Sequence, residues 1–283
     1  MPKLPHPTPT ELRRDPLPLR GRTALVTGAS RRGGIGFAVA RRLAAYGASV
    51  YLHHHVAHDE AMPWGADRPA DVADAVRDVR GEPDAVVAHG PADLTAPDAP
   101  ARLVRDAAEA LGGRLDIVVA NHALSGSDGT LDTIDAAMLD AHWAVDARSV
   151  VLLVQAYARH RAATAAAETG GRVVMMTSGQ DIADGMPEEI AYALQKGALA
   201  SITRSLATTL APQFVTVNTV NPGPVDTDYL DGETYESIAE LFPAKRWGMP
   251  DDPARLIAWL ATDEAAWITG QVIDSEGGFR RTS

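Results

Sequence analysis

Tyr192 and Lys196 are the residues whose types and spacing are best suited to acid–base chemistry. They are four positions apart, so on a helix both side chains project from one face. A cation beside a phenol favours the phenolate and lowers the tyrosine pKa from about 10 towards neutrality. Tyr192 could then exchange a proton near neutral pH. Ser178 lies fourteen positions earlier, at the end of an apolar run, and adds a hydroxyl to the set.

A glycine-rich stretch near the N-terminus, residues 27–36, has the composition of a phosphate-binding turn. It follows an apolar run at 23–26, which predicts a buried strand, and precedes 37–43, which has helical periodicity. Glycines reach backbone angles that other residues avoid, and they let the main chain approach a pyrophosphate at the partly positive N-terminus of a helix. By itself the pattern also fits a flexible loop, so its interpretation depends on the rest of the chain.

These motifs occur in an order that resembles the short-chain dehydrogenase/reductase family, with Asn221-Pro222-Gly223 as a further match. The resemblance extends from Leu19 to Phe279 and is nearest to members similar to 3-oxoacyl-acyl-carrier-protein reductases. It implies that Ser178 bonds the substrate oxygen and that Tyr192 gives or takes its proton. It also implies that Lys196 tunes the tyrosine and bonds the nicotinamide ribose, while a hydride passes between the nicotinamide and the carbinol carbon.

The turn and the resemblance together indicate a set of cofactor contacts. The set is Gly28, Ser30, Arg31, Arg32, Gly34, Ile35, Gly36, His54, Asp93, Leu94, Asn121, Tyr192, Lys196, Pro222, Gly223, Val225 and Thr227. The expected strand at 48–53 ends in histidines, whereas an Asp or Glu there would bind the ribose 2′-hydroxyl of NAD. Because two arginines also stand in the turn, NADP(H) is favoured. NAD(H) stays open, since acidic residues follow in the next loop.

Two positions depart from the family pattern. Asp146 stands where the family has an asparagine that bends a helix and holds a water against the lysine, so it joins the candidate catalytic set. If ionised, it would partly cancel the lysine charge at Tyr192, and Asp146→Asn should then lower the pH at which alcohol oxidation begins. His122 stands where an alanine is usual, and a structural or substrate-facing role fits it better than proton transfer.

Gln180 and Tyr229 complete the candidate substrate contacts, with His122. The departures from the pattern keep an alternative function open. In that alternative the chain binds a dinucleotide but has a lost or altered redox role, as a non-redox enzyme, a sensor or a scaffold.

A cluster of histidines near residue 55 could be interpreted as a metal site. Adjacent residues on a strand point to opposite faces, however, so few of His53, His54 and His55 can converge on one ion. We therefore expect no metal, and interpret the cluster as a solvated loop or a cofactor contact.

Apolar runs alternate with helical segments along the chain. Expected strands are 23–26, 48–53, 85–89, 115–120, 171–178, 214–220 and a seventh near the C-terminus; expected helices include 71–80, 99–111 and 134–167. This alternation predicts an α/β fold, a single Rossmann-type, doubly wound parallel sheet of about seven strands with helices on both faces. The ligand crevice is expected at the carboxyl ends of the strands.

Composition limits the remaining possibilities. The 283 residues are 46% hydrophobic, which is enough for one large core, and no apolar run reaches the roughly 18 residues that a membrane span needs. A net charge of −11 disfavours nucleic-acid binding, and the lack of cysteine excludes disulfides and thiolate zinc sites. We expect an irregular proline-rich tail at 1–18 and a catalytic domain at 19–283, with a substrate lid around 228–247.

The resemblance also implies the partners. It indicates a small-molecule carbonyl or alcohol substrate and a homotetramer, or a dimer, built through the long helices. Because the N-terminal residues have no apolar signal core, a cytoplasmic location is expected.

Overall fold

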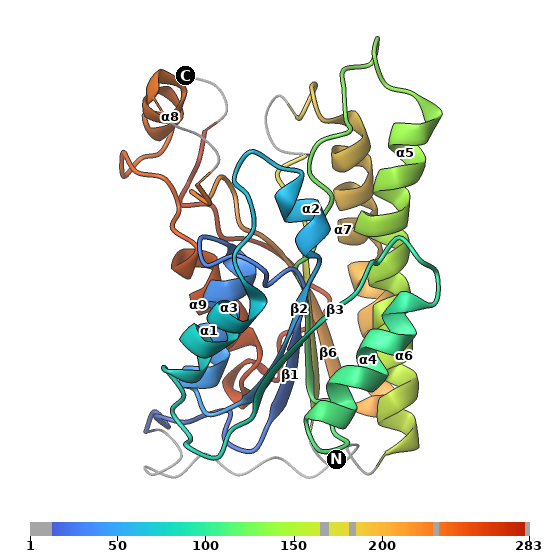
Figure 1. Cartoon of the computed structure of the whole chain (residues 1–283), viewed down its shortest axis with the longest axis vertical. Helices are drawn as coiled ribbons and strands as arrows, with labels where there is room; N and C mark the ends of the chain where they lie inside the picture. The colour runs from blue at the N-terminus through green and yellow to red at the C-terminus, as the bar shows by residue number, and fades with distance from the viewer. Residues whose placement is uncertain (1–12, 165–169, 181–184, 229–231, 281–283) are drawn as a thin grey trace.

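The structure is a computed structural model that describes residues 13–164, 170–180, 185–228 and 232–280. Within these ranges seven strands form one sheet, in the order β3-β2-β1-β4-β5-β6-β7, and every neighbouring pair is parallel (Figure 1). The strands are β1 Thr23–Val26, β2 Ser49–His54, β3 Val87–Pro91, β4 Ile117–Ala120, β5 Gly171–Met176, β6 Val215–Asn221 and β7 Val272–Asp274. The predicted fold is confirmed, and the strand order reverses between β1 and β4.

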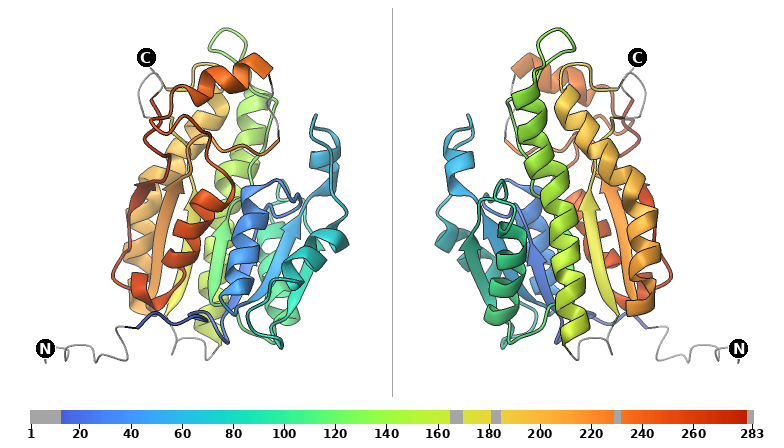
Figure 2. Two further views of the ribbon diagram at one scale, coloured as in Figure 1. Left: turned by 90° about the vertical axis from the view of Figure 1, so that its left-hand side faces the viewer. Right: turned by 90° about the vertical axis from the view of Figure 1, so that its right-hand side faces the viewer.

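Helices cover both faces of the sheet. They are α1 Ile35–Ala45, α2 Val56–Glu60, α3 Pro69–Arg77, α4 Ala99–Ala110, α5 Ala136–His142, α6 Ser149–Ala163, α7 Ile190–Leu210, α8 Gly232–Ala239 and α9 Asp251–Leu260. One layer contains α1, α3 and α9, the other α4, α6 and α7, and the side views in Figure 2 show each layer face on. None of the helices in the described part of the chain is both long and apolar enough to cross a bilayer.

The core lies in two apolar layers, one on each side of the sheet. Val26, Val50 and Val119 point to the layer under α1 and α9, whereas Leu25 and Val118 point to the layer under α4 and α6. Successive residues of a strand alternate between faces, so a strand covered on both sides must be apolar throughout. This is why the strands stand out as short continuous apolar runs.

The long helix expected at 134–167 is interrupted. α5 ends at His142, a π-helical turn follows at Trp143–Arg148, and α6 continues from Ser149. One extra residue in the turn changes the direction of the side chains after it, and such turns are frequent at functional sites. The turn contains Asp146, whose side chain is thereby directed towards the carboxyl edge of the sheet.

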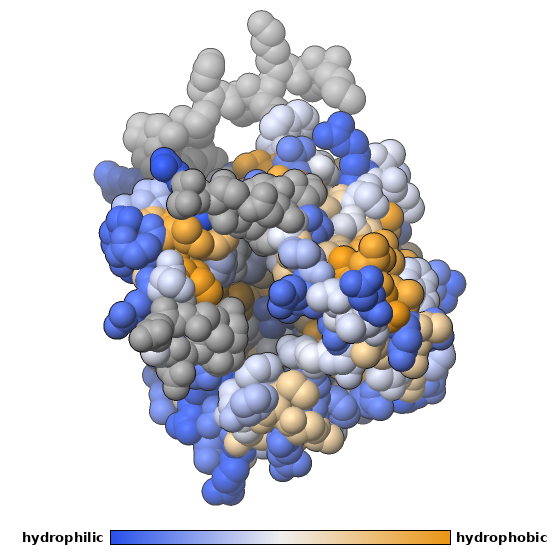
Figure 3. All heavy atoms as spheres, turned by 90° about the horizontal axis from the view of Figure 1, so that it is seen from above, coloured by the Kyte–Doolittle hydropathy of each residue, from blue (hydrophilic) through white to orange (hydrophobic). Residues whose placement is uncertain are grey.

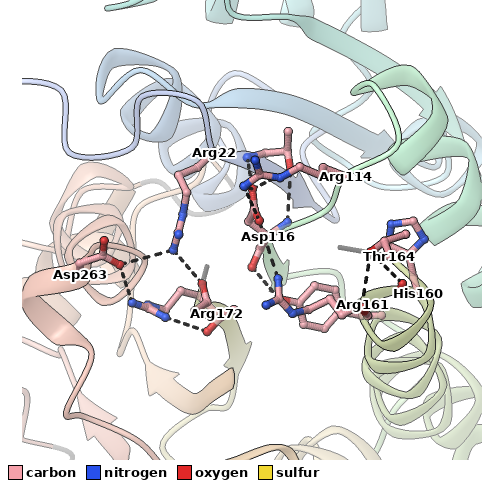
Figure 4. A network of polar contacts seen from close by, with 12 residues as sticks. Arg22, Arg114, Asp116, His160, Arg161, Thr164, Arg172 and Asp263 are labelled. Carbon is pink, nitrogen blue, oxygen red and sulfur yellow. Dashed lines mark hydrogen bonds and ion pairs between the residues drawn. The ribbon is translucent and has the colours of Figure 1, made fainter. Parts of the chain in front are cut away.

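The amino edge of the sheet buries charge in an ion-pair network (Figure 4). Asp116, which is fully buried, accepts from Arg114 at 3.0 Å, and Arg161 Nη1 lies 3.7 Å from its Oδ1. Arg172 donates to Asp263 at 2.8 Å. Removing one partner of a buried pair leaves an uncompensated charge, which is strongly destabilising. The network therefore fixes the starts of β4 and β5.

Candidate active site

A cleft of about 870 Å³ opens at the carboxyl edge of the sheet. Figure 3 looks onto this edge, where apolar side chains lie on either side of polar ones. Of the predicted site residues, those that line the cleft are Gly28, Ser30, Arg31, Gly34, Ile35, Asp93, Leu94, Asn121, His122, Ser178, Tyr192, Pro222, Gly223, Val225 and Thr227. We call the part beside residues 27–36 the turn end, and the part around Tyr192 the reaction end. Tyr229 lies outside the described residues.

Two glycines allow the close packing of the turn against β4. Gly28 has a φ of +64°, and a Cβ there would lie 2.8 Å from the Cα of His122. A Cβ on Gly36 would lie 2.3 Å from the carbonyl oxygen of Gly28. Asn121 donates from its side chain to the carbonyls of Thr27 and Gly28, at 3.1 and 3.0 Å. Gly36 thus shapes the turn from behind rather than lining the cleft.

The N-terminus of α1 is open towards the cleft. Its N-cap is Gly34, which has no side chain that could cap the helix, and no acidic residue lies in the first turn. The first N–H groups of a helix have no partner within it, and they carry a partial positive charge. These features fit the pyrophosphate of a dinucleotide.

The histidines at the end of β2 are buried and neutral. His53 Nε2 lies 3.0 Å from the carbonyl oxygen of Ala92, and its Nδ1 accepts from the N–H of Gly28 at 3.2 Å. A carbonyl only accepts, so the proton is on Nε2 and the lone pair is on Nδ1. Burial lowers the pKa of His53 to about 4. His53 therefore supports the glycine turn from beneath.

His54 is placed away from the cleft. It points to the opposite face of β2, and its Nε2 lies 3.2 Å from Nδ1 of His89. Burial lowers the pKa of His54 to about 4. His53, His55 and His58 line the cleft instead, although the predicted set of cofactor contacts named only His54 of these histidines. The positions of His55 and His58 depend on how the chain turns after β2, for which the sequence has no clear signal.

The two arginines of the turn have different surroundings. Arg31 donates to the carbonyl of Thr227 at 2.7 Å, and its guanidinium carbon lies 5.0 Å from the ring centroid of Trp64. Arg32 pairs with Asp67, which accepts from its Nη2 at 3.0 Å and from its backbone N–H at 2.8 Å. Only Arg31 of the two lines the cleft.

At the reaction end, α7 presents Tyr192 and Lys196 on one face. Lys196 is only 2% exposed, and its Nζ lies 5.3 Å from the ring centroid of Tyr192 while donating to the carbonyl of Met176 at 3.2 Å. Burial lowers the pKa of Lys196, and the charge of Asp146 opposes that change. Ser178 lies on the same side of the cleft, just after β5.

A distant carboxylate caps the N-terminus of α7. Asp128, in the loop after β4, accepts from the N–H groups of Ala191 at 2.9 Å and of Tyr192, 64 positions away, at 2.8 Å. Although burial opposes it, these hydrogen bonds keep the pKa of Asp128 below its ordinary value. The cap fixes the first turn of α7, which carries Tyr192. No local sequence signal marks it, because the partners are far apart in the chain.

Asp146 is completely buried, and both of its oxygens are engaged. Oδ1 accepts from the N–H of Leu124 at 2.7 Å, and Oδ2 lies 2.6 Å from Nδ1 of His142. His142 Nε2 lies 3.0 Å from the carbonyl oxygen of Gly126. Burial lowers the pKa of His142, but the hydrogen bond and charge of Asp146 outweigh it, so the pKa is raised. The i, i+4 spacing of His142 and Asp146 was a signal for this pair.

His122 has a hydroxyl on each side. Its Nδ1 lies 2.7 Å from Oγ1 of Thr27, and its Nε2 lies 2.7 Å from Oγ of Ser149. Ser149 donates its own proton to the carbonyl of Val145, so it must accept from Nε2. Burial lowers the pKa of His122 well below its ordinary value. A neutral ring with both nitrogens engaged favours a structural role.

Gln180 also has a structural partner. Its Oε1 accepts from the N–H of Ser178 at 3.2 Å and from the hydroxyl of Thr177 at 3.3 Å. It stabilises the loop that carries Ser178 and does not itself line the cleft.

The expected lid region contains an aromatic cluster. α8 lies above the carboxyl edge of the sheet (Figure 1), and Tyr235 stacks on Trp247 with ring centroids 5.1 Å apart. Trp247 is buried and donates from Nε1 to the carbonyl of Tyr235 at 2.9 Å. These contacts join α8 to the residues just before α9.

Known proteins resemble the chain over almost its full length. The family model described as Enoyl-(Acyl carrier protein) reductase matches residues 28–280. The uncharacterized oxidoreductase YjdA of Bacillus subtilis (strain 168) is 40% identical over 263 residues, which is 91% of this chain and 96% of the relative. Versicolorin reductase 1 of Aspergillus parasiticus is 31% identical over 275 residues, 92% of this chain and 97% of the relative.

A solved structure agrees with these relatives. A short chain dehydrogenase from Burkholderia cenocepacia J2315, in complex with NADP, is 34% identical and has a TM-score of 0.78. The similarity covers 92% of this chain and 98% of that one. The chain therefore belongs to the short-chain dehydrogenase/reductase family and is an NAD(P)-dependent oxidoreductase.

Proposed function

We propose that the protein transfers a hydride between NADP(H) and a small carbonyl or secondary alcohol substrate. One observation carries the proposal. Tyr192 shares a face of α7 with the buried Lys196, and it lines the same cleft as Ser178 and the glycine turn. The name of versicolorin reductase supports the direction of reduction for a relative of this chain.

Each residue has a defined role in this proposal. Ser178 donates a hydrogen bond to the substrate oxygen, and Tyr192 gives its proton to that oxygen during reduction. Lys196 keeps the phenolate accessible by its charge and contacts the nicotinamide ribose. The bound cofactor supplies or accepts the hydride. Asp128 positions the tyrosine through the cap on α7.

The preference for NADP(H) has two supports. Arg31 lines the cleft, and the solved relative binds NADP. Arg32 would have to leave Asp67 before it could contact a 2′-phosphate, so Arg31 carries most of the preference in this proposal. Those members of the predicted cofactor set that line the cleft, from Gly28 to Thr227, are the proposed cofactor contacts.

The lid and the assembly also belong to the proposal. The predicted lid at 228–247 would cover the substrate, since α8 within it lies above the carboxyl edge of the sheet. A groove of about 650 Å³ lies between α4 and α6, lined by Ala101, Val104, Leu152 and Ala156 among others. This largely apolar face supports a homotetramer or dimer through the long helices. Sedimentation of the purified protein would measure the state.

Cofactor titration and substrate turnover test the function. Nicotinamide fluorescence should show tighter binding of NADPH than of NADH. A panel of cyclic ketones, polyketide-like quinones, sugars and acyl thioesters should then include a compound that consumes NADPH, followed by nicotinamide absorbance. Equal or reversed affinities would contradict the cofactor preference. Tight NADPH binding with no turnover on any class would favour an altered redox role.

A further inference from the structure

His142 is buried between two hydrogen-bond acceptors. Its Nδ1 lies 2.6 Å from a carboxylate oxygen of Asp146, and its Nε2 lies 3.0 Å from the carbonyl oxygen of Gly126. A backbone carbonyl and an ionised carboxylate have no proton to donate. With Asp146 ionised, both ring nitrogens donate, which makes the ring an imidazolium. His142 is 1% exposed, so almost none of its ring reaches solvent.

We propose that His142 is a positioning residue for Tyr192: as an imidazolium paired with Asp146, it neutralises that carboxylate and holds the loop that caps α7. The inference rests on the proposed role of Tyr192 as the proton donor. It assigns to the pair two effects, one electrostatic and one geometric.

The electrostatic effect follows from the charges around the ring. Asp146 faces it from the same helical segment, and Asp128 Oδ2 lies 3.8 Å from Nε2 from the loop after β4. From α7, the Tyr192 ring lies edge-on with centroids 6.3 Å apart, and Lys196 is the nearby cation. An unpaired Asp146 would oppose the charge of Lys196 and raise the pKa of Tyr192. The imidazolium removes that opposition.

The geometric effect follows from the loop that the pair holds. Asp146 accepts from Leu124 N–H, and His142 donates to the carbonyl of Gly126, two residues before Asp128. Asp128 in turn accepts from the N–H of Tyr192. One short loop thus connects the π-helical turn to the first turn of α7. Loss of the His142–Asp146 pair therefore loosens the Asp128 cap on α7 and also changes the charge near Tyr192.

The test is a titration of Tyr192 that needs no substrate. Ultraviolet absorbance of tyrosinate is followed against pH, and the curve of Tyr192→Phe is subtracted to isolate this residue. In His142→Phe the pKa of Tyr192 should rise by about one unit, since a nearby cation is lost and an anion is left unpaired. Adding Asp146→Asn to that variant should bring the pKa of Tyr192 most of the way back to its wild-type value. If the role of His142 were purely structural, the second substitution would not restore the pKa of Tyr192.

The control is Asp135→Asn, the same substitution at the exposed cap of α5, where Asp135 accepts from Met138 N–H at 2.9 Å. It should leave the Tyr192 titration unchanged. If His142→Phe does not fold, His142→Gln replaces it, and heteronuclear NMR of the wild-type imidazole nitrogens should show both protonated at neutral pH.

Two results would overturn the inference. One is a pKa of Tyr192 that is unchanged in a folded His142 variant, or that changes there and is not restored in the double variant. The other is a wild-type His142 ring with a single protonated nitrogen at neutral pH. The turnover of Tyr192→Phe is a separate measurement, so a failure of the proposed function would be recognised independently.

Discussion

At the turn end of the cleft, His53 is buried between the N–H of Gly28 and the carbonyl of Ala92, whereas at the reaction end His142 is buried between a carboxylate and a carbonyl. Burial lowers the pKa of His53 to about 4. At His142, burial acts in the same direction, but the hydrogen bond and charge of Asp146 raise the pKa. Two histidines of similar burial thus have pKa values shifted in opposite directions.

This contrast indicates that the partner of each ring nitrogen, and not burial alone, sets the direction in which the histidine pKa shifts. It also gives the two ends opposite pH dependence. His53 has a folded pKa below its unfolded value of about 6.5, so its contribution to stability is lost as pH falls from about 6.5 towards 4. His142 has a raised folded pKa, so its contribution is present at low pH and is lost as pH rises through that value.

The largest effect is expected at the reaction end, from Tyr192→Phe. The substitution keeps the ring and removes the proton donor, so turnover should fall by about a hundredfold or more, while NADPH affinity changes little. Lys196→Ala should reduce both, because the cation acts on the phenol and on the cofactor. Steady-state kinetics and fluorescence titration measure the two quantities. Substantial activity in Tyr192→Phe would require another proton donor, with His122 and His142 the first to examine.

The next largest effect is expected at the turn end, on the pH dependence of stability. His53→Asn keeps an acceptor for the N–H of Gly28 but cannot be protonated. Between pH 7 and pH 5 the wild type should lose about 2 kcal/mol more unfolding free energy than the variant, because the shift at His53 is absent from the variant. Urea unfolding at the two pH values measures this. Equal losses in both proteins would mean that His53 does not titrate on unfolding.

A smaller effect concerns the exposed charges at the turn end. Asp67→Asn removes the carboxylate that pairs with Arg32, and the free guanidinium can then approach a 2′-phosphate. An exposed ion pair contributes up to about 1 kcal/mol, so the NADPH to NADH affinity ratio should increase by no more than about fivefold. Arg32→Ala is the matched control and should not increase the ratio. If the affinity ratio is unchanged in Asp67→Asn, Arg32 does not contribute to the preference for NADPH, and Arg31 is the arginine that does.

The smallest effect sharpens the comparison at the reaction end. Asp146→Asn alone removes the carboxylate, and His142 then loses the interaction that raises its pKa. The pair is neutral before the substitution and nearly neutral after it, so the pKa of Tyr192 should move by less than about half a unit. From the sequence, in which Asp146 had no evident cation partner, the expected shift is downward by some fraction of a unit. A larger downward shift would mean that His142 does not neutralise Asp146.

The amino-acid sequence by itself determined the features that depend on near neighbours. The apolar run at 23–26, the glycines after it and the helical periodicity from 37 predicted β1, the turn and α1, which the structure confirms. The i, i+4 spacing placed Tyr192 and Lys196 on one face of α7. Continuous apolar runs predicted parallel strands covered on both sides, because the periodicity of a strand or helix is a local property.

Only the tertiary structure decided the partners of the polar groups. Asp128 caps α7 from 64 positions away, and His122 is held between Thr27 and Ser149 from two other elements. The side chain of His54 faces away from the cleft that it was expected to contact. Hydrogen bonds and pKa values depend on atoms within a few ångströms in space, whatever their separation in sequence. For that reason the charge of His142, and with it the environment of Tyr192, became visible only when the loop after β4 was seen against α5 and α7.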